Sequence, residues 1–203
     1  WSNYNSAQLT LGGTTSGTNA GTYTATFTPT GNYAWADGTT DAKSVTWTIS
    51  KAVGSLTLSK SSLTLNAATL STTFTVTRLG DGAINVTSSA TNVATVTLSG
   101  TTVTVTAKGK GSATITVSVG AGTNHSAPAN KTCSVTVTLP TTTLKDNSWA
   151  TVRQASDAGN GANYWAVGDT KPVTINGKVG NFTFSNFTVD AFILGFNHNA
   201  SRE

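Results

Sequence analysis

Apolar and polar residues alternate with a period of two along most of this 203-residue chain. The stretches "SAQLTL" (6–11), "GTYTATFT" (21–28) and "SVTWTIS" (44–50) show this alternation near the start. Since successive side chains of a β-strand point to opposite faces, each stretch predicts a strand that is buried on one face and wet on the other. A loop rich in turn residues, 29–43, separates the last two predicted strands.

The alternation is clearest from Val53 to Leu139, which contains about seven or eight short alternating runs. Glycine-containing turns separate several of these runs, at "GDG" (80–82), "SG" (99–100) and "GKG" (109–111). Short strands at this spacing are typical of a β-sandwich. The lone Cys133 falls inside one alternating run, so we expect it to be a buried, reduced side chain.

The last segment, from Pro140 onward, has a different pattern. "DNSWATVRQASDAG" (146–159) predicts a short amphipathic helix. Its N-cap is Asn147 or Ser148, its apolar positions are Trp149 and Val152, and Gly159 stops it. "YWAVGDTKPVTING" (164–177) and "NFTFSNFTVDAFILGF" (181–196) predict strands. The continuous apolar run "AFILGF" at the end of the second is typical of a strand covered on both faces.

The predicted strand "GTYTATFT" follows a bend and places Tyr23 two residues before Ala25. This arrangement resembles the tyrosine corner of immunoglobulin-like sandwiches, in which a Tyr near the start of the penultimate strand hydrogen-bonds back across the preceding corner. The resemblance implies that the first three strands are the last three of about seven, and that residues 1–52 are an N-terminally truncated domain.

A second resemblance covers nearly all of the middle segment. "SSATNVATVTLSGTTVTVTAKGKGSATITVSV" (88–119) resembles bacterial Ig-like domains of group 2. The pieces "NSWATVRQASDAG", "YWAVGD" and "ILGFNHNAS" are similar to the start of a domain of unknown function that follows Ig-like repeats in phage and prophage structural proteins. Together the resemblances imply an all-β chain of tandem immunoglobulin-like β-sandwiches, 1–52 and 53–139, followed by a partial α+β domain, 140–203.

Composition argues against several classes of partner. Only 10% of the residues are charged, against roughly 25% in an average soluble domain. The net charge of +4 comes from basic residues spread along the whole chain. Nucleic-acid binding needs a basic stripe or aromatic platforms interleaved with Arg and Lys, and neither is visible. The apolar run 191–196 is too short to span a membrane.

Candidate catalytic groups are few. His125 and His198 each have a Ser nearby, Ser126 and Ser201, but the sequence has no Gly-x-Ser-x-Gly motif. The one Glu is terminal, and the Asp residues fall mainly in turns, where they stabilise the turn. "DGTTD" (37–41) offers too few oxygens for calcium. We therefore expect no enzymatic activity, no cofactor and no metal.

Exposed aromatic and polar loop residues are the better candidates for a contact surface, because exposed rings can stack on sugars. Tyr33 and Trp35 lie in the long loop, and His198 follows the last apolar run. Packing of the loop against the core is an alternative role for the two aromatic residues. Trp47 alternates in phase with its strand and is expected to be core.

These observations favour a non-catalytic structural or adhesive module of a phage virion or bacterial surface protein, located extracellularly, with the Ig-like domains as spacer or decoration. The alternative is an accessory region of a secreted carbohydrate-active enzyme. Expected partners are other copies of the chain, virion or cell-surface proteins, and surface glycans; nucleic acid and membrane insertion are not expected. Both end segments lack strands of a full domain, so we expect neighbouring chains to complete their sheets. The alternative is that these segments are held together by packing on the central sandwich.

Overall fold

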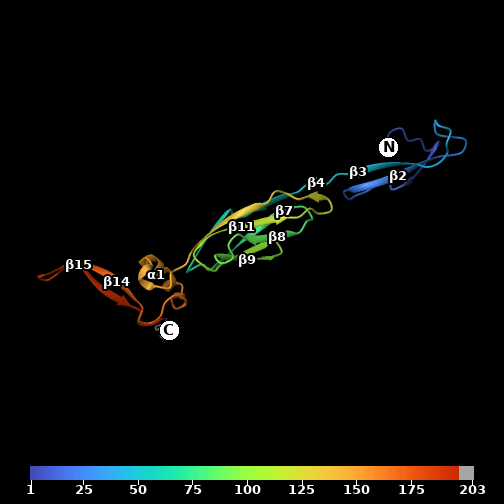
Figure 1. The fold of residues 1–203 in the computed structure, drawn as a ribbon. Coiled ribbons are helices and arrows are strands. Elements are labelled where there is room, and N and C mark those ends of the chain that lie inside the picture. Colours follow the sequence, from blue (N-terminus) through green and yellow to red (C-terminus); the bar gives the residue numbers. More distant parts are fainter. Residues whose placement is uncertain (197–203) are drawn as a thin grey trace, which may run out of the picture. The chain divides into compact units, whose positions relative to one another are not determined.

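A computed structural model describes residues 1–196 as an all-β chain that ends in a short α+β segment (Figure 1). The chain divides into two compact units. Unit 1 contains Trp1–Thr57, Thr77–Asn85 and Val117–Lys131; unit 2 contains Leu58–Val76, Val86–Thr116 and Thr132–Glu203. The central sandwich has residues in both units.

The first sheet confirms the three strands predicted near the start. Its order is β1-β2-β3, with all pairs antiparallel: β1 is Leu9–Gly13, β2 is Gly21–Pro29 and β3 is Lys43–Ile49. The register pairs apolar residues on one face, such as Phe27 with Leu11 and Ala25 with Val45. Threonine and serine pair on the other face, so the hydroxyl groups of their side chains make that face polar.

The tyrosine corner is present. The hydroxyl of Tyr23 donates to the carbonyl oxygen of Asn19 at 2.6 Å, and its ring stacks on Trp47 with centroids 4.7 Å apart. Ala25, two residues later, is fully buried. The sheet differs in one detail from the expectation that its strands are the last three of a seven-stranded sandwich. In the seven-stranded scheme the strand before the corner belongs to the opposite sheet, whereas β1 pairs with β2 and so takes the place of strand C.

The middle segment forms two four-stranded sheets (Figure 1). One has the order β5-β7-β10-β9 and the other β6-β13-β11-β8. Taking β5 and β6 as the two halves of strand A, these orders are A-B-E-D and A-G-F-C, which is the topology of an immunoglobulin-like sandwich. The bounds are β5 Ser55–Leu58, β6 Ser62–Asn66, β7 Ser71–Leu79, β8 Ile84–Ser88, β9 Ala94–Ser99, β10 Thr102–Ala107, β11 Gly111–Val119 and β13 Lys131–Thr138.

The sandwich core is built from the alternate residues of these strands. Phe74, Leu65 and Ile115 are its largest fully buried side chains, and valines fill most of the remaining volume. Cys133 is fully buried and forms no disulfide, and its burial raises the pKa of the thiol. The prediction of a buried Cys133 is thereby confirmed.

The last segment begins with a 3-10 turn, η1 (Leu144–Asp146), and the helix α1 (Trp149–Asp157). Ser148 is the N-cap, since its side chain accepts from the amide of Thr151, and Gly159 ends the helix region with a positive φ of 69°. The predicted apolar face is partly wrong: Ala155 is buried, whereas Trp149 is exposed and lies under the ammonium group of Lys171, 5.2 Å from its ring centroid.

The last two strands of the chain, β14 (Thr170–Val179) and β15 (Phe182–Phe192), form a two-stranded hairpin. The prediction of a strand from residue 164 is wrong at its start, because 161–163 form a second 3-10 turn, η2 (Gly161–Asn163), and Trp165 is buried beside Ala67 and Leu144. The run 191–196 leaves β15 after Phe192. Phe192 and Leu194 are 60% and 80% exposed, so this chain does not cover both faces of the run.

Candidate contact surface of the first sheet

The apolar face of the first sheet carries a cluster of aromatic rings. Trp1 packs edge-on against Phe27 and Trp47, at centroid distances of 5.4 and 6.3 Å. Tyr4 lies 6.2 Å from Phe27, and its hydroxyl donates to the carbonyl oxygen of Leu9. The N-terminal turn therefore lies over the sheet. It covers the face incompletely: among residues 1–50, all of which the structure describes, Ala25 alone is fully buried.

A pocket of about 450 Å³ opens between this turn, the sheet and the long loop. Its walls are mainly aromatic and aliphatic, and the amide of Asn3, two serines and one ammonium group supply the polar atoms. The side chains that define it are Trp1, Tyr4, Phe27, Trp35, Lys43 and Val45. Apolar walls with a few convergent polar groups are typical of small-molecule sites.

Trp35 reaches the pocket because its loop is tied at several points. Its indole nitrogen donates to the carbonyl oxygen of Asp41 and its amide to that of Thr39, both at 2.8 Å. Asp37 accepts from the hydroxyl and amide of Thr39 and from the ammonium group of Lys43 at 2.7 Å. The same ammonium group lies 5.2 Å from the centroid of the Trp35 ring, a cation–π distance.

Asp37 is held in its charged form by these contacts. The hydrogen bond from Lys43 lowers the pKa of Asp37 most, and the two hydrogen bonds from Thr39 lower it further, to well below its ordinary range. Both carboxylate oxygens thus already have partners within the loop. The acidic residue stabilises the turn that presents Trp35, in keeping with the turn function expected from the sequence.

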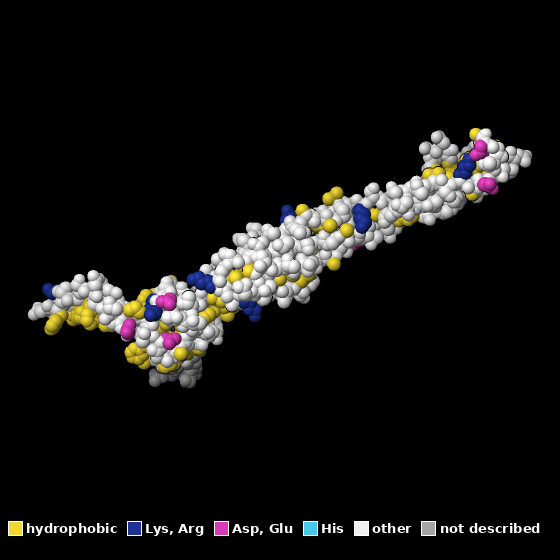
Figure 2. Space-filling view, viewed as in Figure 1, with side chains coloured by type: hydrophobic (Ala, Val, Ile, Leu, Met, Phe, Trp, Pro, Cys, Tyr) yellow, Lys and Arg dark blue, Asp and Glu magenta, His cyan; other side chains and the backbone are white. Residues whose placement is uncertain are grey.

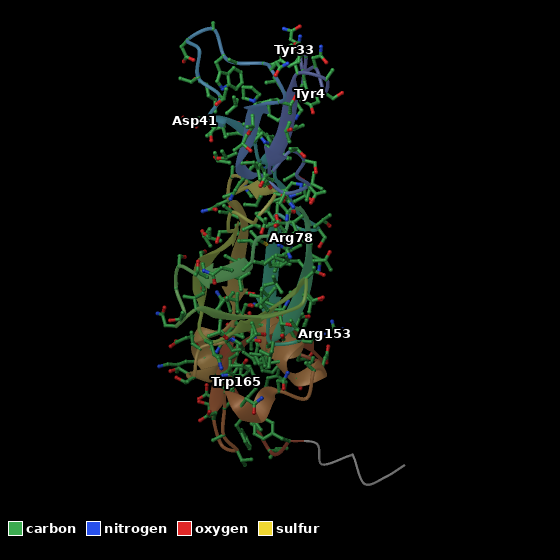
Figure 3. The ribbon with its side chains drawn as sticks, turned by 90° about the vertical axis from the view of Figure 1, so that its right-hand side faces the viewer. Tyr4, Tyr33, Asp41, Arg78, Arg153 and Trp165 are labelled. Carbon is green, nitrogen blue, oxygen red and sulfur yellow. The ribbon has the colours of Figure 1, made fainter. Side chains whose placement is uncertain are left out.

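The structure separates the three sequence-predicted contact residues. Trp35 lines the pocket. Tyr33 is 48% exposed and is not part of the pocket wall, although it lies at the same end of the sheet as Tyr4 and Asp41 (Figure 3). His198 lies outside the described residues. The sequence did not indicate Trp1, Tyr4 or Lys43 as pocket residues. Trp1 and Tyr4 lie in a turn, which has no periodic pattern. Lys43 lines the pocket only because β3 pairs with β2.

His125 has an acidic partner that the sequence did not predict. Its Nδ1 atom lies 3.3 Å from the carboxylate of Asp81. The carboxylate also accepts from the amides of Thr123 and Asn124. Desolvation raises the pKa of Asp81, but these hydrogen bonds outweigh it and lower the pKa to about 2. The hydroxyl of the neighbouring Ser126 donates to the carbonyl oxygen of Ala52 and not to His125. The contact between Asp81 and His125 therefore closes a loop.

That loop, 120–126, is joined to the first sheet inside unit 1. The side-chain oxygen of Asn124 accepts from the amide of Ala20 at 2.7 Å, and its amide nitrogen donates to the side chain of Asn19 at 2.9 Å. The Lys51 ammonium group donates to the carbonyl oxygen of Gly122 at 2.6 Å. Two short strands, β4 (Ala52–Val53) and β12 (His125–Ser126), pair in parallel beside these contacts.

Backbone packing makes the same region tight. Gly54 is buried, and a Cβ atom there would lie 2.4 Å from the carbonyl oxygen of Ser126. β3 ends at Ile49, so only Ser50 and Lys51 separate it from β4. The connection between the first sheet and β5 is therefore a hydrogen-bonded segment with no free linker of Gly and Ser residues.

Among the residues that the structure describes, no group of three or more His, Cys, Asp or Glu side chains is placed to hold a metal ion. Within the same residues, no helix has the length and hydrophobicity needed to cross a membrane.

Comparison with known proteins gives little. No family model matches the sequence, and no curated protein matches it. Among solved structures, the chain is similar to domains 4 and 5 of the S-layer protein SbsC, with 24% sequence identity and a TM-score of 0.36. The match covers 58% of this chain and spans 58% of the length of that structure. A likeness at this TM-score assigns neither fold nor function to this chain.

Proposed function

We propose that the chain is a non-catalytic structural module of an extracellular bacterial surface protein or phage virion, in which the immunoglobulin-like sandwich acts as a spacer. The hydrogen-bonded connection between the first sheet and the loop 120–126 is the observation that carries this proposal. A spacer must keep consecutive elements at a fixed distance and orientation. A connection that is hydrogen-bonded through Asn124 resists bending better than a flexible linker does.

The polar surface is consistent with such a function. Threonine and serine hydroxyls cover the outer faces of the strands, and few residues are charged. An uncharged, hydroxyl-rich β-surface stays hydrated over a wide range of salt and pH, since there is little charge to screen or titrate. The phage and the cell-surface context share this requirement, and the proposal includes both.

Replacing Asn124 with alanine is expected to loosen this connection. The amide of Ala20 loses its acceptor, and its hydrogen exchange should accelerate on the order of tenfold, equivalent to about 1.4 kcal/mol for a lost hydrogen bond. Amide exchange and ¹⁵N relaxation of the full chain measure the effect. Asn130→Ala, in an exposed position of the same segment, is the matched control. Equal protection of Ala20 in both variants would contradict the proposal.

A second candidate function is saccharide binding, as in an accessory region of a carbohydrate-active enzyme. The pocket of Trp1, Tyr4, Phe27 and Trp35 favours it, because aromatic walls beside a few hydroxyl, amide and ammonium groups suit the faces and edges of a sugar ring. This function and the spacer function are compatible, since they use different residues of unit 1.

A further inference from the structure

The hairpin β14–β15 is amphipathic along its whole length. Its register pairs Val173 with Val189, Ile175 with Phe187 and Val179 with Phe182. The alternate pairs carry the polar and charged residues, including Asp190 and Lys178. Since alternate pairs of a hairpin face opposite sides, one face is apolar except for Lys171, which pairs with Ala191 at its near end. Figure 2 shows hydrophobic side chains gathered along one side of this hairpin.

A β-bulge keeps the large side chains on that face. Phe184 and Phe187 are three residues apart, so a regular strand would point them to opposite sides. The register shifts between Ile175 and Gly177, and Asn186 adopts a positive φ of 54° while its amide donates to the side chain of Asn176 at 2.6 Å. The two phenylalanine rings consequently lie 5.6 Å apart. Bulges of this kind re-aim side chains, at the cost of an unusual backbone conformation.

The near end of the apolar face is covered and the far end is not. Lys171 is buried, and its ammonium group donates to the carbonyl oxygens of Lys145 and Asn147. These two hydrogen bonds attach the start of β14 to η1 and to Asn147, the residue that follows η1. Further along, the side chains are between 37% and 76% exposed: Ile175, Val179, Phe182, Phe187 and Val189. A two-stranded sheet with a bare apolar face is marginal in water.

We propose that this apolar face of β14–β15 binds the same face of a second copy of the chain. The exposed part of this face carries no charge, because Lys171 at its near end is buried, so two copies meet without repulsion. A twofold arrangement uses one surface twice. The exposed side chains present on the order of 500 Å² per copy, so face-to-face packing buries about 1,000 Å², the lower limit for a specific interface. This inference does not depend on the spacer function, because the residues involved are different.

Sedimentation equilibrium of the full chain over about 1–500 µM tests the proposal. The unmodified chain is expected to show a monomer–dimer equilibrium, and Phe182→Ser to raise the dimer dissociation constant at least on the order of tenfold. Phe182 is already exposed, so the substitution should leave the fold intact. Leu79→Ser, which alters an exposed apolar residue of β7, is the matched control and should leave the equilibrium unchanged.

Cross-linking distinguishes this face from other surfaces. Phe187→Cys is expected to give a covalent dimer with a bismaleimide reagent whose spacer is about 10 Å long, the distance between facing sheets. Leu79→Cys is not expected to do so, and the buried Cys133 does not compete. A chain that stays monomeric throughout the concentration range would overturn the proposal, as would one that instead binds phosphatidylcholine vesicles. Dimers that form without cross-linking at position 187 would also overturn it, since they would use another surface such as the first sheet.

Discussion

Gly82→Ala is expected to destabilise the protein by several kcal/mol, on the order of 3 or more. Gly82 is buried beside the backbone of Gly120, and a Cβ atom there would lie 1.8 Å from the carbonyl oxygen of Gly120. No rotation of a side chain can relieve an overlap with backbone, so the two segments must separate. That movement strains the hydrogen bond between the Gly120 amide and the Ala83 carbonyl oxygen, which is 2.9 Å long.

The facing glycine provides the control. A Cβ atom at Gly120 would lie 3.9 Å from the nearest backbone atom, the carbonyl oxygen of Ala83, which is an ordinary contact. Gly120→Ala should therefore shift the urea midpoint by far less than Gly82→Ala. The two midpoints, measured on the full chain at one temperature, give the comparison. Similar midpoints would show that the two segments do not approach as closely as described.

Saccharide binding by the pocket should depend strongly on Trp35. Its ring forms one wall of the pocket and is backed by Lys43. Trp35→Ala is expected to weaken binding of oligosaccharides on the order of 30-fold, because removal of a central aromatic contact typically costs about 2 kcal/mol. Isothermal titration with neutral oligosaccharides and with oligomers of N-acetylglucosamine measures the affinity of each variant.

Tyr33→Ala is the matched control for this prediction. Tyr33 comes from the same loop and is also aromatic, but it is not part of the pocket wall. The substitution should change the affinity by less than about threefold. Absence of binding by the unmodified chain, or equal losses in the two variants, would remove saccharide binding as a function of the pocket.

Local patterns predicted the parts of the fold that depend on neighbours in sequence. Period-two alternation predicted β1, β2 and β3. The resemblance of Tyr23 and its preceding bend to a tyrosine corner implied a hydrogen bond back across that bend, and the structure shows its acceptor to be Asn19. Ser148 could be recognised as one of two possible N-caps because capping needs only the residues that follow it. Burial of Cys133 followed from its phase within an alternating run.

Long-range contacts determined the rest. Asp81 was expected to stabilise its own turn, yet its carboxylate holds amides more than forty residues away. Trp165 was placed in a strand, but it is buried against Ala67 of the sandwich and Leu144 of η1, which no periodicity indicates. One missed feature had a local signal: the spacing of Phe182, Phe184 and Phe187 changes from two to three at Asn186, where the bulge lies.

Residual dipolar couplings of the unmodified chain show whether the first sheet and the loop 120–126 keep one fixed orientation, which the spacer function requires. Amides of β2 and β3 and amides of the loop 120–126 should fit a single alignment tensor, because these elements are joined through Asn124, Lys51 and the β4–β12 pair. Two separate tensors, with smaller couplings for the first sheet, would show a flexible connection and contradict the spacer function.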